Sequence, residues 1–287
     1  MNNYIIALLK CKGVSSSKIA RYIINNDFDN YKIKNNLRNI IEYEDYLKFS
    51  EYLKIANIEI ELNSNRNIKL ITMLDSNFPK KLYEGSEPIV YLYYKGNISL
   101  LNNKLVSVMS GKDVVNAPLE YSTKISAILS NNDITVVGGL TSIVDTYSHI
   151  GALSGKGSTI AVLPTDLEHI LPSSNKQLAN DILENNGCLV SEYSIGHILN
   201  KYCYEKRDRV QTTIADAILL IEAKENSPTM EIIKKSKREN KLVYQLSTNM
   251  NRSIRNIINI DRDSDIEAFI KKVKEEKRIV NEQLTLF

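Results

Sequence analysis

Polar, basic and glycine residues follow the strands of an alternating strand and helix pattern that runs from Leu105 to Ala223. Because a parallel sheet places the loops after its strands along one edge, residues far apart in the chain converge there on one crevice. Glycines let a ligand approach the backbone, and a helix that starts near Thr141 offers free amides to an anion. The edge is therefore predicted to bind phosphate, and its candidate ligands are Ser110, Gly111, Lys112, Gly138, Gly139, Thr141, Lys206, Arg207 and Arg209.

Two features of this edge admit a second interpretation. The Gly138-Gly139 pair also suits a tight turn between strand and helix, with the nearby cations simply solvated. Asp208 stands between Arg207 and Arg209. A carboxylate that points into the crevice would repel a polyanion, whereas one that turns inward would orient its neighbours. The sequence leaves both choices open.

Four further ionisable residues belong to the same edge. Asp145 and His149 are spaced i, i+4 on one helical face, so we expect them to meet as a hydrogen-bonded pair with a structural role. Ligand contact is the second option, and catalysis would need a nucleophile and a third partner, which the sequence does not supply. Glu192 and Glu222 each end a strand, where they could form an acid–base pair but more often accept hydrogen bonds from loop amides. We predict no catalytic residue, metal site or cofactor.

Short apolar runs predict the strands that position these loops, and such runs are typical of a sheet covered on both faces. Helices fill the gaps, with Pro118 in the first turn of one and Thr141 or Ser142 as the cap of another. The pattern predicts an α/β fold, an extended Rossmann-like doubly wound parallel sheet. Its expected strands are Leu105–Met109, Ile134–Val137, Thr159–Leu163, Cys188–Ser191, Ala217–Ile221 and Leu242–Gln245.

The chain is expected to have three parts. Residues 1–62 form a small all-α domain, residues 63–250 form the Rossmann-like domain with a linker and its first strands at 63–100, and residues 251–287 form a helical tail. Within the first part, Leu8 to Ala20 predicts helix, tight turn and helix, with Gly13 able to take a positive φ. This segment resembles the helix-hairpin-helix of a SAM-like domain, and a purely structural helical hairpin is the alternative.

Composition limits the class of protein. A chain of 287 residues with 43% hydrophobic content can bury a sizeable core. Its formal net charge of +3 is too small to indicate a nucleic-acid partner by itself. We find no run of about 18 apolar residues and no signal-like start, so we expect a cytoplasmic protein without a membrane span. Cys11, Cys188 and Cys203 form no CxxC pair and are expected to be reduced packing residues.

The order and spacing of several short motifs between Phe78 and Ser247 resemble those of the DprA/Smf family of DNA-processing proteins. These motifs are Phe78-Pro79-Lys80-Lys81-Leu82, Pro88 to Asn97, Val137-Gly138-Gly139-Leu140, Asp145 with His149, Gly151-Ala152-Leu153, Gly157 to Leu163, Leu171 to Asn175, Ser191-Glu192-Tyr193 and Arg207-Asp208-Arg209. Each motif is weak alone, and the set is specific.

The resemblance implies a Rossmann-like domain that binds single-stranded DNA, helps to load RecA recombinase and forms a homodimer. The chain departs from the family pattern at four places, two of which are at Ile143 and at Ser227-Pro228-Thr229-Met230. The other two involve candidate phosphate ligands. The chain has Ser110-Gly111-Lys112 where the family usually has Gly-Ser-Arg, and Arg207-Asp208-Arg209 where the family usually has Arg-Asn-Arg. The first of these keeps a glycine and a cation but shifts the turn.

The last five residues, Gln283-Leu284-Thr285-Leu286-Phe287, resemble the bacterial sliding-clamp-binding peptide. In that peptide a Gln anchors the start, while Leu and an aromatic residue enter a hydrophobic groove. The resemblance implies clamp-binding roles for Gln283, Leu284, Leu286 and Phe287. The alternative is that these apolar side chains pack onto their own domain.

These observations favour a non-enzymatic protein that binds single-stranded DNA in DNA uptake, recombination or related DNA metabolism, with RecA or the sliding clamp as its partner. Two alternatives stay open. The crevice could hold a small nucleotide in a sensing module, for example in phage defence. The chain could also be an interaction protein whose ligand site has decayed.

Overall fold

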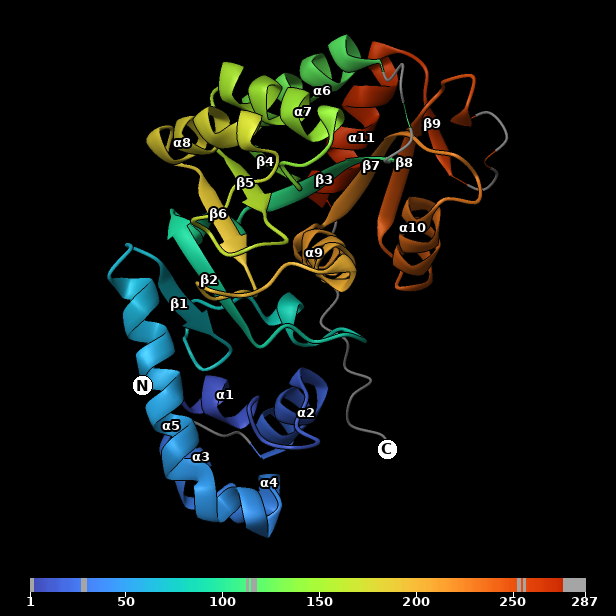
Figure 1. Ribbon diagram of the computed structural model, residues 1–287. Helices are drawn as coiled ribbons and strands as arrows, with labels where there is room; N and C mark the ends of the chain where they lie inside the picture. Colours follow the sequence, from blue (N-terminus) through green and yellow to red (C-terminus); the bar gives the residue numbers. More distant parts are fainter. Residues whose placement is uncertain are drawn as a thin grey trace.

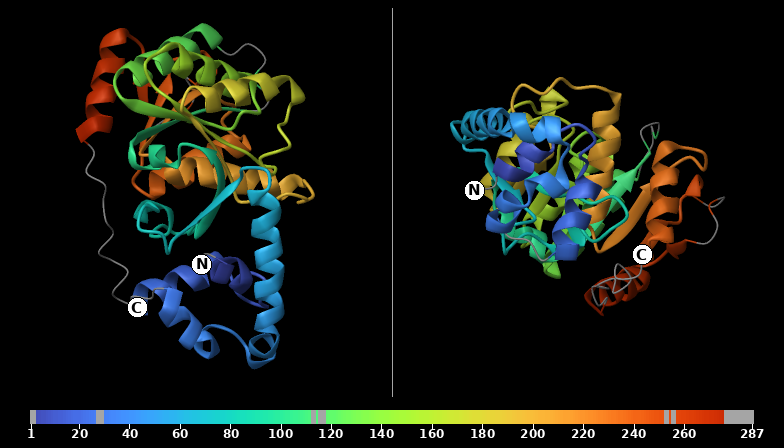
Figure 2. Two further views of the ribbon diagram at one scale, coloured as in Figure 1. Left: turned by 90° about the vertical axis from the view of Figure 1, so that its left-hand side faces the viewer. Right: turned by 90° about the horizontal axis from the view of Figure 1, so that it is seen from below.

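The computed structural model describes residues 3–26, 30–111, 114, 118–251, 254 and 257–275. Its N-terminal part is helical, as the apolar spacing predicts. Gly13, with a φ of +69°, turns the chain between the first two helices, and the Lys12 amide donates to Asp45 Oδ2 at 2.8 Å. These helices lie together, and α5 leads from them to the sheet (Figures 1 and 2). They are α1 (Asn3–Leu8), α2 (Ser16–Asn26), α3 (Asn30–Asn35), α4 (Leu37–Ile40) and α5 (Tyr43–Ser64).

Nine strands of the described residues form one sheet in the order β1-β2-β6-β5-β4-β3-β7-β8-β9. Strands β3 to β9 are parallel, and β1 and β2 extend one edge antiparallel. This mostly parallel sheet confirms the predicted α/β class. The strands are β1 (Lys69–Thr72), β2 (Tyr91–Gly96), β3 (Lys104–Ser110), β4 (Ile134–Gly138), β5 (Thr159–Val162), β6 (Cys188–Ser191), β7 (Ala217–Glu222), β8 (Leu242–Leu246) and β9 (Ile258–Ile260).

Helices cover both faces of the sheet (Figure 1). Along β3, Val106 and Val108 pack with α6, α7 and α11, whereas Met109 packs with α10 on the opposite face. Burial on both faces explains why the strands are nearly continuous apolar runs. One face carries α6 (Leu119–Asn131), α7 (Ile143–Ser154), α8 (Lys176–Glu184) and α11 (Asp263–Glu275), and the other carries α9 (Lys201–Ile214) and α10 (Pro228–Arg238). Short 3-10 helices among the described residues include η1 (Lys80–Leu82), η2 (Ile98–Asn102) and η3 (Ser173–Asn175).

The chain changes direction across the sheet at β3. It moves outward from β3 to β4, β5 and β6, and then returns to the other side of β3 as β7. Open α/β sheets bind ligands at the carboxyl ends of the strands where such a reversal occurs. There the Gly111 amide donates to the Glu222 carbonyl at 2.8 Å. Among the described helices, none has the length and apolar character needed to cross a bilayer.

Candidate functional site

The turn from β4 to α7 forms the centre of the carboxyl edge. Ser142 caps α7, and its hydroxyl accepts from the Asp145 amide at 3.0 Å. In return, Asp145 Oδ2 accepts from the amides of Thr141 at 3.1 Å and Ser142 at 2.9 Å. This reciprocal capping satisfies donors at the start of the helix. Two amides that the sequence offers to a phosphate are therefore bonded to the protein's own carboxylate.

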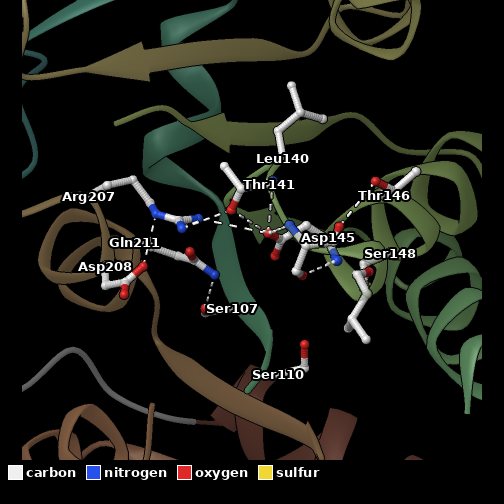
Figure 3. Close-up of polar contacts among 12 residues, drawn as sticks. Ser107, Ser110, Leu140, Thr141, Asp145, Thr146, Ser148, Arg207, Asp208 and Gln211 are labelled. Carbon is white, nitrogen blue, oxygen red and sulfur yellow. Dashed lines mark hydrogen bonds and ion pairs between the residues drawn. The ribbon is translucent and has the colours of Figure 1, made fainter. Parts of the chain in front are cut away.

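Arg207 reaches this turn from α9 (Figure 3). Its Nη2 donates to Thr141 Oγ1 at 2.9 Å, and its Nη1 lies 3.8 Å from Asp145 Oδ2. Its Nε lies 2.9 Å from Asp208 Oδ1, so Asp208 pairs with its neighbour. The Arg207 side chain is only 5% exposed. The contacts with Thr141 and Asp145 join α9 to the β4–α7 turn, while the contact with Asp208 lies within α9. Asp208 therefore has the second of its two possible orientations, in which it orients a neighbouring arginine.

Burial and hydrogen bonding act in opposite directions on Asp145. Burial by itself would raise the pKa of its carboxyl group. The Arg207 guanidinium and the amides of Ser142 and Thr141 lower this pKa, and together they outweigh the effect of burial. The net result is a pKa below the usual value for aspartate. Asp145 is therefore an ionised carboxylate at neutral pH, held inside the fold by a cation and by backbone donors.

Side chains of the protein occupy the space beside both glycines of the turn. A Cβ on Gly138 would lie 2.8 Å from His149 Nε2, and a Cβ on Gly139 would lie 1.1 Å from Arg207 Nη1. Neither residue has a positive φ, so the need for glycine comes from space rather than from backbone angle. The glycines permit the imidazole and the guanidinium to pack against the end of β4.

His149 does not form the hydrogen-bonded pair with Asp145 that the i, i+4 spacing predicts. Its Nδ1 lies 2.9 Å from Thr159 Oγ1, and Thr159 Oγ1 donates to the Val136 carbonyl at 2.7 Å. Because that hydroxyl proton is used, Nδ1 must carry the proton of the His149 ring. Nε2 has no hydrogen-bond partner among the described residues. The Asp145 carboxylate instead accepts hydrogen bonds from the backbone amides of the turn and forms an ion pair with Arg207.

Burial lowers the pKa of His149 from 6.5 to about 4, although Asp145 opposes the shift. The unfolded chain therefore binds a proton that the folded chain excludes, and the fold loses stability as pH falls below 6.5 toward 4. Between about pH 7.5 and about pH 5, we expect His149 to account for a loss of about 2 kcal/mol in the free energy of unfolding. Urea denaturation at the two pH values measures it.

The matched variants for this pH dependence are His149→Gln and His169→Gln. His149→Gln should reduce the loss, because its amide does not titrate. His169 is exposed and lies 2.9 Å from Asp166 Oδ2, so its replacement serves as the control and should leave most of the loss in place. An identical pH dependence in wild type and His149→Gln would contradict the assignment.

Arg209 also points into the protein. Its Nη1 donates to the carbonyls of Glu87 at 3.2 Å and Pro88 at 3.1 Å, and its Nη2 donates to both carboxylate oxygens of Glu192. The Glu192 side chain is 9% exposed. Glu192 thus accepts from a side chain rather than from the loop amides that the sequence favours. These contacts tie α9 to the end of β6 and to the segment before β2.

The other predicted residues lie in several places. Ser110 is the last residue of β3, and Gly111 follows it where the chain order reverses across the sheet. Glu222 is buried at the end of β7. Lys206 is exposed on α9. Lys112 and the clamp-like residues Gln283, Leu284, Leu286 and Phe287 lie outside the described residues. The structure therefore brings together the β4–α7 turn, Asp145, His149 and Arg207, and it places Arg209 with Glu192 beside them.

A polar contact beneath this turn was not predicted from the sequence. Gln211 Nε2 donates to Ser107 Oγ at 2.9 Å, and both residues are buried (Figure 3). The available signal was Ser107 itself, a hydroxyl inside the apolar run of β3, which requires a partner when buried. Among the described residues there is no cluster of three or more His, Cys, Asp or Glu side chains able to hold a metal ion.

Comparisons with known proteins agree with this architecture. A curated relative, DNA processing protein DprA of Streptococcus pneumoniae, is 26% identical over 248 residues, which cover 86% of this chain and 87% of that protein. Protein Smf of Borreliella burgdorferi is 25% identical over 168 residues, 58% of this chain and 54% of that protein. The chain thus spans about half the length of the Borreliella protein.

Two solved structures share the fold. The X-ray structure of Streptococcus pneumoniae DprA has a TM-score of 0.75 at 22% identity and covers 93% of this chain and 98% of that one. DNA processing protein A of Helicobacter pylori, described for its single-stranded DNA binding mode, has a TM-score of 0.61 at 22% identity over 71% of this chain and 95% of that one. The family profile named DNA recombination-mediator protein A matches residues 69–260, and the chain belongs to that family.

Proposed function

We propose that this chain binds single-stranded DNA along the carboxyl edge of its sheet and mediates recombination or DNA uptake without catalysing a reaction. The observation that supports the proposal is the extent of the family match. It begins at residue 69 and ends at residue 260, the first residue of β1 and the last of β9. The family resemblance therefore covers the whole sheet and every loop at its carboxyl edge.

Three of the cations on α9, namely Lys206, Arg207 and Arg209, have different roles in this proposal because their contacts differ. Arg207 and Arg209 are bonded to protein acceptors, so we assign them to holding α9 against the edge. Lys206 is exposed and can reach a phosphate. Lys112, in the loop that follows Ser110 and Gly111, is proposed to supply the second phosphate contact at the carboxyl end of β3. In this proposal Gly138, Gly139 and Thr141 have an indirect role. His149 packs against Gly138, and Arg207 packs against Gly139 and donates to Thr141.

The proposed partners follow from the family and from the tail. We propose that the chain delivers single-stranded DNA to a RecA recombinase, that it works as a homodimer, and that Gln283 to Phe287 bind the sliding clamp. We place all of these activities in the cytoplasm.

Titration of the protein with a labelled single strand of about 20 nucleotides, at about 50 mM and about 200 mM salt, tests the DNA proposal. We expect affinity to fall steeply with salt, because bound cations release counterions from the strand. Lys206→Glu should weaken binding by about tenfold and reduce the salt dependence, since one phosphate contact is lost. Fluorescence anisotropy gives both quantities.

Lys54→Glu is the matched control, because Lys54 is exposed on α5. It should bind the strand as wild type does. Salt-independent binding, or equal effects of the two substitutions, would contradict the proposed interface. Tight binding of a mononucleotide with no binding of the strand would favour the nucleotide-sensing alternative.

A further inference from the structure

Between β6 and α9, two aromatic rings are stacked at the carboxyl edge. The rings of Tyr193 and His197 have centroids 4.1 Å apart and an interplanar angle of 25°. Tyr193 is 8% exposed and forms the buried layer, while His197 is an exposed residue. The stack therefore exposes the His197 imidazole to solvent, and the buried Tyr193 ring supports its inner face.

The edge of the His197 ring is held as well as its inner face. His197 Nε2 lies 3.5 Å from Cys203 Sγ, and the Asn200 amide donates to the same sulfur at 3.4 Å. Cys203 is 1% exposed on the first turn of α9. Asn200 caps that helix, and its side chain accepts from the Tyr202 amide at 2.9 Å. A surface ring with so many fixed contacts has lost much of its side-chain entropy before any ligand arrives.

Lys206 near the ring, and a second cation and aromatic pair at the start of α9, favour a nucleic acid as the ligand. Burial and the nearby Lys206 lower the pKa of His197, and Asp166 opposes them with a smaller effect. The ring is therefore neutral at pH 7. The ammonium of Lys201 lies 5.0 Å from the centroid of Tyr202, a second exposed aromatic ring. Cations beside exposed rings are the combination by which proteins hold single strands, because phosphates pair with the cations and bases stack on the rings.

We propose that the outer face of His197 is a stacking position for one nucleobase of a bound single strand, with Lys206 contacting a neighbouring phosphate. This inference rests on the proposed function and adds to it the part of the strand that the β6–α9 loop recognises. Stacking on a ring tolerates any base, so the position contributes affinity without sequence preference.

The test compares two fluorescein-labelled strands of about 20 nucleotides, oligothymidine and an abasic strand with the same phosphates. Wild type should bind oligothymidine more tightly than the abasic strand. His197→Ala should weaken oligothymidine binding by about tenfold and leave binding of the abasic strand within about twofold. His197→Phe keeps a flat ring without the sulfur contact and should bind oligothymidine within about threefold of wild type.

A strand with 2-aminopurine in place of a base gives a second readout, because its fluorescence is quenched on stacking. Wild type and His197→Phe should quench it, and His197→Ala should quench it less. Tyr43→Ala removes an exposed ring from α5 and should change neither measurement. If His197→Ala binds oligothymidine as tightly as wild type does, the stacking position is wrong while DNA binding stands. If wild type binds neither strand, both the stacking position and the proposed function are wrong.

Discussion

Arg209→Met is expected to lower the free energy of unfolding by about 2–3 kcal/mol, because it removes one partner of a partly buried ion pair and leaves the carboxylate without its donors. The Glu192 carboxylate, 9% exposed, would lose both guanidinium bonds. The carbonyls of Glu87 and Pro88 would lose a donor at the same time. Urea denaturation at pH 7 measures the change.

Arg21→Met is the control for this loss, because Arg21 is exposed on α2. A surface substitution of this kind should change stability by no more than about 0.5 kcal/mol. Measuring both the stability and the DNA binding of Arg209→Met distinguishes a structural role of Arg209 from direct phosphate binding. If Arg209→Met weakens DNA binding strongly but unfolds at the same urea concentration as wild type, Arg209 binds phosphate directly and its internal contacts are dispensable.

The strands and caps could be predicted because local sequence determines them. The strands predicted from Leu105–Met109 to Leu242–Gln245 agree with β3 to β8 within one residue at each end. Each is an apolar run that only a doubly covered sheet can bury. Ser142 was one of two expected caps, and it forms the reciprocal bonds with Asp145. Strand β9 was not predicted, because it is three residues long and two of them are exposed.

The partners of the charged residues could not be predicted, because they depend on contacts far apart in sequence. The sequence places Arg209 and Glu192 at the same edge but does not say that they bond to each other. The spacing of Asp145 and His149 puts both on one face of α7, yet the His149 imidazole forms its hydrogen bond with Thr159 on the next strand. Since competing donors and acceptors decide such contacts, helical spacing alone cannot identify the pair.

Gly139→Ala is expected to destabilise the fold by about 3–5 kcal/mol, because the new methyl group would lie where the Arg207 guanidinium now is. The backbone of Gly139 has no positive φ, so alanine itself is tolerated there and the clash with Arg207 causes the loss. The guanidinium would have to leave Thr141 and Asp145, and a buried carboxylate would lose its cation. Thermal or urea denaturation measures the effect.

A double-mutant cycle isolates this cause. Arg207→Ala empties the space beside Gly139, so Gly139→Ala in that background should lower the free energy of unfolding by less than about 1 kcal/mol. The double variant should therefore lose less stability than the sum of the two single variants. Gly85→Ala is the control, because a Cβ there meets nothing within 4 Å and the backbone angle is ordinary. It should be neutral or slightly stabilising. Additive losses at Gly139 and Arg207 would mean that the glycine is required for the turn itself, and the guanidinium would then not be the reason that β4 ends in two glycines.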